Sequence, residues 1–130
     1  MITIYTDGAC FGNPGPMGIG VVIYKDNQKI HELSQFIGNG TNNIAEYRAV
    51  ISAIEFIGSI CLVSEKILIK SDSQLLVRQL NGEYKVRDKT LFQLYQKIKS
   101  FKLNISFVHI DRELNTEADK LSKQAIEVKK

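Results

Sequence analysis

The chain has 130 residues, of which 44% are hydrophobic and 24% are charged, and its formal net charge is +3 with a pI near 8.8. This length fits one compact domain over residues 1–130, and the composition excludes a disordered chain or a membrane-embedded one. The mildly basic charge is compatible with a polyanionic partner but does not establish one. No apolar run reaches the roughly 20 residues that cross a bilayer, and the N-terminus lacks the pattern of a signal peptide. We therefore expect a cytoplasmic protein in which Cys10 and Cys61 are free thiols.

The first part of the chain has the patterns of β-strands separated by turns. The first strand is predicted to end near Asp7, and the dense turn signal Gly12-Asn13-Pro14-Gly15-Pro16 follows it. Asp26-Asn27 supplies the chemistry of a second, tight turn. The predicted strands are 2–7, 18–24 and 29–37. Three strands joined by short loops favour an antiparallel meander.

The rest of the chain alternates between helical spacing and short apolar runs. The predicted helices cover 44–57, 73–80, 91–101 and 116–128, and the predicted strands cover 66–71 and 105–108. Asn42 or Asn43 is a suitable N-cap for the first helix, and Ser73 for the second. The order βββ-α-β-α-α-β-α predicts an α/β fold with a mixed five-stranded sheet, in which helices flank three antiparallel strands and then parallel ones.

Four acidic residues stand out because each lies at the end of a predicted element. Asp7 ends the first strand, and Asp72 follows the fourth. A helical crossover places parallel strands side by side, so both carboxylates are expected at one edge of the sheet, where α/β proteins build ligand sites. Glu46 is placed in the first turn of the long helix, and Asp119 near the start of the last one. Each of these two alone fits equally well a helix-start acid that complements the macrodipole.

A cluster of carboxylates requires positive charge nearby, because packed acids raise one another's pKa. Hard divalent cations with oxygen ligands, Mg²⁺ or Mn²⁺, meet this need, and no Cys/His set suggests zinc. An all-carboxylate site without a nucleotide-binding loop is typical of two-metal phosphoryl chemistry. We therefore expect Asp7, Glu46, Asp72 and Asp119 to be both metal ligands and catalytic residues.

Four segments, in order, resemble those of type 1 ribonuclease H, and together they extend over most of the chain. They are YTDGACFGNPGPMGIG, TNNIAEYRAVISAIE, IKSDSQLLVRQLNGEY and NTEADKLSKQA. The resemblance implies the ribonuclease H-like fold and an endonuclease. It also implies hydrolysis of the RNA strand of RNA–DNA hybrids with two Mg²⁺ or Mn²⁺ ions, leaving 3′-hydroxyl and 5′-phosphate ends. We also expect a monomer, since no obligate protein partner is evident from the sequence.

The same resemblance assigns roles to individual residues. Asp7, Glu46, Asp72 and Asp119 match the four metal-binding carboxylates of the family. Asn13, Asn43 and Gln74 match contacts to the RNA strand, and Thr41 and Asn42 match a pocket for a phosphate of the DNA strand. Amide side chains suit this role, because the 2′-hydroxyl both donates and accepts hydrogen bonds. For Asn42 and Asn43, helix capping is an equal alternative, and the two roles are compatible.

The chain departs from the longer members of the family in two places. The longer members carry a loop histidine ahead of the last acid. In this chain the loop is shorter, so either His109 matches that histidine or Arg112 takes its place. Longer members also insert a basic helix and loop where this chain has only NGEYKVRDKT, at 81–90. The basic residues of this segment are either solvated or form a smaller phosphate-binding surface than in the longer members. They are Lys85, Arg87 and Lys89. His31 is interpreted as structural, on an exposed strand face.

Two other functions remain compatible with the sequence. One is a catalytically weak module that binds hybrids, although all four acids are present. The other is a different nuclease on the same scaffold, since one fold hosts several activities. The matches at Asn13, Asn43 and Gln74 favour hybrid recognition over that second alternative.

Overall fold

The structure is a computed structural model that describes residues 1–60 and 64–129. Cys10 is a free thiol, as expected, whereas Cys61, for which the same was expected, lies outside the described residues. The elements, in chain order, are β1 (Ile2–Cys10), β2 (Gly15–Lys25), β3 (Gln28–Gly40), α1 (Asn42–Ser59), β4 (Ile67–Ser71), α2 (Gln74–Leu80), α3 (Lys89–Ser100), β5 (Ile105–His109), the short 3₁₀ helix η1 (Arg112–Leu114) and α4 (Thr116–Lys129).

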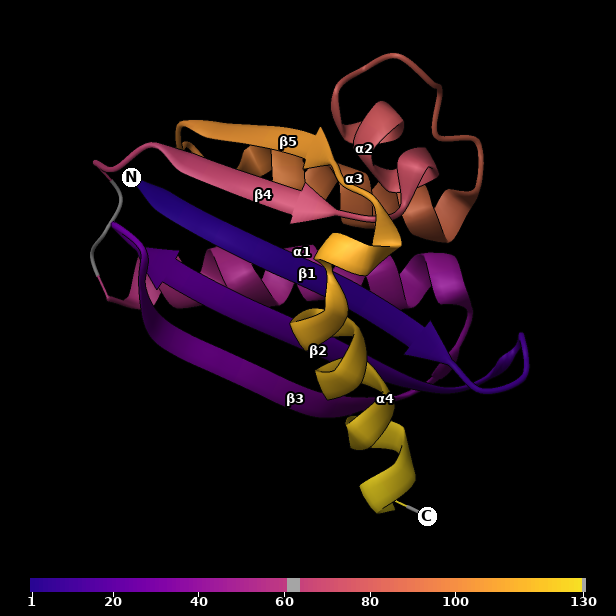
Figure 1. Cartoon of the computed structure of the whole chain (residues 1–130). Coiled ribbons are helices and arrows are strands. Elements are labelled where there is room, and N and C mark those ends of the chain that lie inside the picture. Colours follow the sequence, from indigo (N-terminus) through magenta and orange to yellow (C-terminus); the bar gives the residue numbers. More distant parts are fainter. Residues whose placement is uncertain (61–63, 130) are drawn as a thin grey trace.

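The five strands form one mixed sheet in the order β3-β2-β1-β4-β5. The first three strands pair antiparallel, and β1, β4 and β5 pair parallel. Figure 1 shows α1 behind the sheet and α4 across its front. The predicted fold class is confirmed, including the adjacency of the first and fourth strands that was expected to bring Asp7 and Asp72 together.

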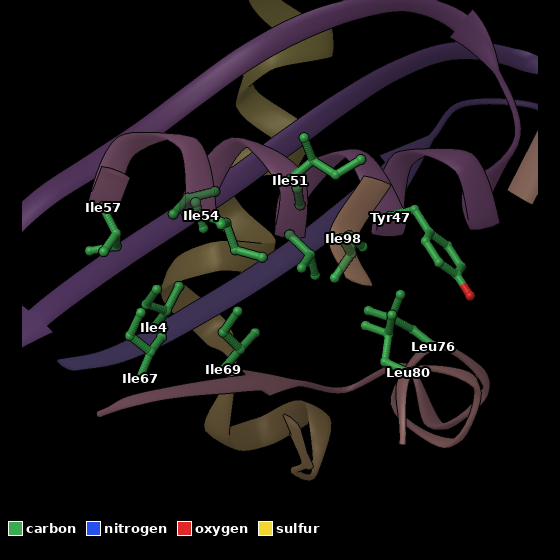
Figure 2. Packing of buried hydrophobic residues seen from close by; sticks show 14 of the residues in the cluster. Ile4, Tyr47, Ile51, Ile54, Ile57, Ile67, Ile69, Leu76, Leu80 and Ile98 are labelled. Atoms are coloured by element: carbon green, nitrogen blue, oxygen red, sulfur yellow. The ribbon is translucent and has the colours of Figure 1, made fainter. Parts of the chain in front are cut away.

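The main core lies between the sheet and α1. Alternate residues of β1, including Ile2 and Ile4, face this helix, and Ile54 and Ile57 of the helix are fully buried against them (Figure 2). The helix is apolar on a broad stripe because its buried residues recur three and four positions apart. Burying each such isoleucine contributes roughly 1.5–3 kcal/mol to the free energy of unfolding. This layer therefore fixes the start of α1 relative to the edge of the sheet.

Helix α4 packs very closely on the other face of the sheet, over β2. A Cβ atom added to Gly20 would lie 2.1 Å from the carbonyl oxygen of Ala118, and one added to Gly18 would lie 2.2 Å from that of Ser122. The two glycines therefore allow a helix–strand distance that a side chain would prevent. This close approach brings Asp119 and its neighbours on α4 to the edge of the sheet.

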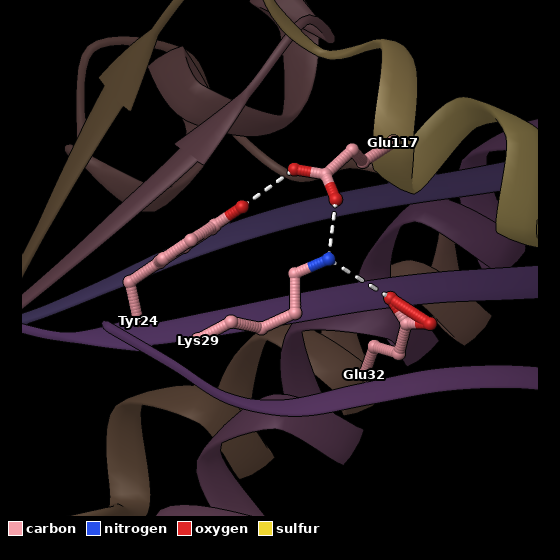
Figure 3. Close-up of polar contacts among 4 residues, drawn as sticks. All are labelled: Tyr24, Lys29, Glu32 and Glu117. Atoms are coloured by element: carbon pink, nitrogen blue, oxygen red, sulfur yellow. Dashed lines mark hydrogen bonds and ion pairs between the residues drawn. The ribbon is translucent and has the colours of Figure 1, made fainter. Parts of the chain in front are cut away.

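A polar cluster also ties the start of α4 to the meander (Figure 3). The Tyr24 hydroxyl donates to Glu117 at 2.6 Å, and Lys29 Nζ lies 2.6 Å from the other oxygen of that carboxylate. Lys29 also pairs with Glu32 at 3.3 Å. These groups are partly exposed, so they orient the helix start more than they stabilise the fold.

Several predicted boundaries and orientations differ from the structure. β1 continues to Cys10 because its pairing with β2 extends to Met17, so Asp7 lies inside the strand. Thr41, not Asn42 or Asn43, is the N-cap of α1, and its hydroxyl accepts from the amide of Ile44. Helix α1 thus begins earlier than predicted.

Two smaller expectations can also be compared with the structure. His31 does not lie on an open face but stacks on Phe56 of α1, with ring centroids 3.7 Å apart. The tight turn at Asp26 and Asn27 is confirmed, since both have positive φ, at 50° and 70°. In the part of the chain that the structure describes, no helix combines the length and the apolar character needed to cross a membrane.

Candidate metal centre

The position of Asp7 follows from a difference in length between two neighbouring strands. β4 pairs with β1 only as far as Ser71, which lies opposite Thr6, whereas β1 runs on to Cys10. From Asp7 onward, β1 therefore has no partner on its β4 side, and the sheet edge opens there. Asp72 follows Ser71 directly, so its carboxylate comes to the same opening.

Glu46 reaches this opening from α1 because the helix touches β1 at Gly8. A Cβ atom on Gly8 would lie 2.3 Å from the backbone nitrogen of Glu46, so only glycine permits the contact. The Gly8 amide donates a hydrogen bond to the Glu46 carboxylate. Since α1 begins at Asn42, Glu46 lies in its second turn and not in the first turn as predicted. This placement disfavours its interpretation as a helix-start acid.

Asp7, Glu46 and Asp72 form one compact cluster. Each offers a carboxylate oxygen, and these three oxygens lie within 4.8 Å of one another. Asp7 is 6% exposed and Glu46 is 8% exposed, while Asp72 is half-buried. The three acids come from β1, α1 and the end of β4, which explains why they are far apart in the sequence.

Asp119 lies next to these three acids, and its side chain hydrogen-bonds with that of Asp7. Its carboxylate borders the same hollow as Asp7 and Asp72, but it pairs with Lys123 at 3.2 Å, one turn further along α4. Between them, the buried Ser122 hydroxyl lies 3.2 Å from Oδ2 of Asp7 and 2.8 Å from the carbonyl oxygen of Asp119. Helix α4 is thus connected to the cluster through both residues.

Burial of the cluster disfavours its negative charge. Burial, followed by repulsion from Glu46 and Asp72, raises the pKa of Asp7 to about 10. Burial also raises the pKa of Glu46, to about 7, although hydrogen bonds from Asp7 and Gly8 oppose the rise. In the metal-free protein these two carboxyls therefore hold protons at a pH where ordinary acids have lost them.

This donor set fits a hard divalent cation. All of the atoms that meet are carboxylate oxygens, the ligands that Mg²⁺ and Mn²⁺ prefer. A cation placed among them would favour the charged form of these carboxyls and so lower their pKa values. The cluster is also open to solvent through two adjoining hollows, which share Asp7, Gly8, Asn42, Asp72 and Arg112.

Comparison with known proteins places the chain in a family. A family model described as reverse transcriptase-like matches residues 5–125. A ribonuclease H of Syntrophus aciditrophicus is 36% identical over 143 aligned residues, which cover 95% of this chain and 79% of that protein. LC11-RNase H1, a compost-derived protein crystallised with an RNA/DNA hybrid, is 44% identical with a TM-score of 0.93 over 98% of both chains. The chain belongs to the type 1 ribonuclease H family.

Some relatives of the chain are considerably longer. The bifunctional protein Rv2228c of Mycobacterium tuberculosis is 34% identical over 97% of this chain, but the match covers only 35% of that protein. The chain therefore spans about a third of the length of that relative, and the solved N-terminal RNase H domain of the same relative matches 95% of this chain.

The predicted substrate-contact residues have different surroundings in the structure. Asn42 borders both hollows, and Asn43 borders the one that contains Glu46. Asn13 is exposed, and its Oδ1 accepts from the backbone amide of Asn42 at 3.0 Å, which fixes the Gly-Pro loop to the start of α1. Thr41 is engaged in capping α1.

Gln74 and His109 are not among the residues that line either hollow. Gln74 is exposed at the start of α2, after Ser73, which caps that helix as predicted. His109 ends β5, opposite Ser71, with its side chain exposed. Arg112 of η1, in contrast, borders both hollows. Of the two candidates for the loop role, the structure thus brings only Arg112 to the acids.

Ser122, Lys123 and Asn115 contact the acids but were not predicted from the sequence as site residues. Two of them carried a usable signal. Residues three and four positions apart share a helix face, so a helix that presents Asp119 must also present Ser122 and Lys123 nearby. Asn115 had no such signal, because its contacts are to β1 and to the end of β4.

Proposed function

We propose that this ribonuclease H hydrolyses the RNA strand of RNA–DNA hybrids with Mg²⁺ or Mn²⁺, leaving 3′-hydroxyl and 5′-phosphate ends. The observation that carries the proposal is the meeting of the Asp7, Glu46 and Asp72 carboxylates at the open edge of the sheet. The hybrid bound to LC11-RNase H1 supports the choice of substrate, since that protein shares the fold over nearly its whole length.

The proposed site holds two ions between the four acids. Asp7 and Asp72 would be shared by both ions, and Glu46 and Asp119 would each help to hold one of them. Bound there, the ions would activate water and neutralise the charge that develops at the phosphate and on the leaving oxygen. The chain's own part is to hold the carboxylates rigidly: Gly8 positions Glu46, and Ser122 positions Asp7.

Selection of the hybrid is assigned to polar groups around the hollows. Asn13 and Asn43 would contact the RNA strand, and the Asn13 side chain also accepts from the backbone amide of Asn42. Thr41 and Asn42, at the start of α1, would contact a phosphate of the DNA strand, and Gln74 the RNA strand from the side of α2. These contacts read sugar identity and strand shape and not base sequence.

Arg112 is assigned the role that a loop histidine has in longer members of the family. Its place beside both hollows allows its guanidinium to contact a phosphate oxygen of the substrate or of the product. His109, at the exposed end of β5, is the matched residue for comparison.

The test is cleavage of an end-labelled RNA–DNA hybrid with Mg²⁺ or Mn²⁺. We expect the parent to cut the RNA strand, Asp72→Asn to be inactive, and Arg112→Ala to lose about 10²-fold or more in kcat/KM, within the range of general electrostatic contributions. His109→Ala should stay close to the parent. Equal losses in the Arg112 and His109 variants would refute the assignment of Arg112.

The same assay separates the rival functions. A folded parent that binds the hybrid but does not cut it with either metal would indicate a binding module. Cutting of branched DNA in preference to the hybrid would indicate a different nuclease on this scaffold.

A further inference from the structure

We propose that Asn115 is a positioning residue that holds the Asp72 carboxylate in place for the divalent ions; this inference rests on the function proposed above. The side chain of Asn115 is 1% exposed and lies where η1 meets α4. Its amide nitrogen lies 2.9 Å from the carbonyl oxygen of Thr6 and 3.4 Å from Oδ2 of Asp72. One side chain thus connects β1, at the residue before Asp7, with Asp72 at the end of β4.

The backbone of Asn115 fixes a third element. Its amide donates to the carbonyl oxygen of Arg112, and its carbonyl oxygen accepts from the amide of Asp119 at 3.1 Å. The residue is therefore in contact with the segments that carry Asp7, Asp72 and Asp119 at once. A shift of Asn115 would change the relative position of three of the four acids.

Helix capping is the ordinary role of asparagine at such a position, and it does not explain this side chain. A capping asparagine uses Oδ1 to accept from an amide two or three residues further on. Here Oδ1 of Asn115 is buried without a partner among the described residues, while the nitrogen makes both contacts. The side chain is therefore oriented by Thr6 and Asp72 and not by the helix.

The direction of the two hydrogen bonds explains why an amide suits this position. An amide NH₂ group has two donors, and both face oxygen acceptors here. A donor on Oδ2 of Asp72 restrains the orientation of the carboxylate. Groups that orient metal ligands in this way typically change metal affinity about 10- to 100-fold when they are removed.

The first test is Mn²⁺ binding to the full chain without substrate, measured by calorimetry and by the rise of the unfolding temperature. We expect Asn115→Ala to weaken Mn²⁺ binding about 10- to 100-fold. The matched control is Asn81→Ala, since the Asn81 amide also donates to a backbone carbonyl, that of Phe107 at 3.2 Å, away from the acids. The control should bind Mn²⁺ as the parent does, even though it too loses a hydrogen bond.

Parent-like Mn²⁺ affinity in folded Asn115→Ala would overturn the proposal. If the parent itself fails to bind Mn²⁺ or to cut the hybrid, the proposed function fails and not this inference alone. If Asn115→Ala does not fold, nuclear magnetic resonance of the parent decides. The side-chain NH₂ signals of Asn115 should shift when Mg²⁺ is added while those of Asn81 stay unchanged, and unshifted Asn115 signals would refute the role.

Discussion

The buried carboxyls of Asp7 and Glu46 make the stability of the metal-free protein depend on pH. Their pKa values in the folded state are raised, mainly by burial, to about 10 and about 7, from ordinary values of 3.8 and 4.5. The folded chain therefore binds more protons than the unfolded chain above about pH 4. Because of this difference, the free energy of unfolding is highest at low pH, where both carboxyls are protonated. It falls as the pH rises towards 7 and beyond.

Asp7→Asn should remove the larger part of this dependence. We expect the free energy of unfolding of the variant, minus that of the parent, to increase between pH 5 and pH 8 when both are measured by urea unfolding in EDTA. Each extra proton bound by the folded parent adds up to about 1.4 kcal/mol per pH unit to the difference. A difference that stays flat over this range would show that Asp7 titrates normally.

Glu117→Gln is the matched control for this experiment, because the Lys29 ammonium lowers the pKa of the Glu117 carboxyl. The stabilisation from Glu117 is therefore lost as the pH falls, which is opposite in sign to the effect of Asp7. Saturating Mn²⁺ should reverse the order of the parent and Asp7→Asn, since only the parent keeps the full set of ligands.

At the scale of elements, the packing of α4 on β2 determines where Asp119 and Ser122 lie. The helix can approach only because Gly18 and Gly20 have no side chains. Gly58, near the end of α1, provides a contrast, since a Cβ atom there would meet nothing within 4 Å. The two kinds of glycine therefore respond in opposite ways to the same substitution.

Gly20→Ala should destabilise the protein by about 1–3 kcal/mol, because its methyl group would overlap the carbonyl oxygen of Ala118 and push α4 outward. It should also lower hybrid cleavage, since Asp119 and Ser122 would move with the helix. Gly58→Ala should instead raise stability by about 0.5–1 kcal/mol and leave cleavage unchanged. Urea unfolding of both variants measures the effect, and equal stability changes would contradict this account of the packing.

The elements themselves were largely predictable, because hydrophobic periodicity is local information. All five strands and four helices were expected in the correct order, whereas the 3₁₀ helix η1 was not. The errors lie at the ends: β1 continues past Asp7 because β2 pairs with it, and Thr41 caps α1 in place of Asn42 or Asn43. Strand pairing and capping geometry depend on contacts that no local pattern contains.

At the scale of the whole molecule, the convergence of the acids could be predicted only in part. Adjacent parallel strands required Asp7 and Asp72 to be close, and the structure confirms this. The inclusion of Glu46 depends on the contact of Gly8 with α1, and the position of Asp119 depends on the close packing of α4 on Gly18 and Gly20. Both are tertiary contacts, which no local pattern in the sequence contains.

The charge of the whole molecule leads to a prediction about salt. The formal net charge is only +3, and Lys85, Arg87 and Lys89 are exposed near the turn between α2 and α3. Few phosphates can therefore be neutralised, and the affinity for a hybrid should fall gently with salt. With about three phosphate contacts, the slope of log K against log salt would be near −3, since each contact contributes about −0.9 on duplex DNA.

The measurement is hybrid binding by the Asp72→Asn variant between about 50 and 200 mM salt, a range over which few contacts should cost well under the 10³-fold lost by proteins with many. Adding Lys85→Ala and Arg87→Ala to this variant decides between the two interpretations of the loop. If the loop binds phosphates, the slope of log K against log salt should become shallower by up to about 2, roughly one for each lost contact. If the loop is only solvated, the slope should not change, and the hybrid must then be held mainly by the residues around the acids.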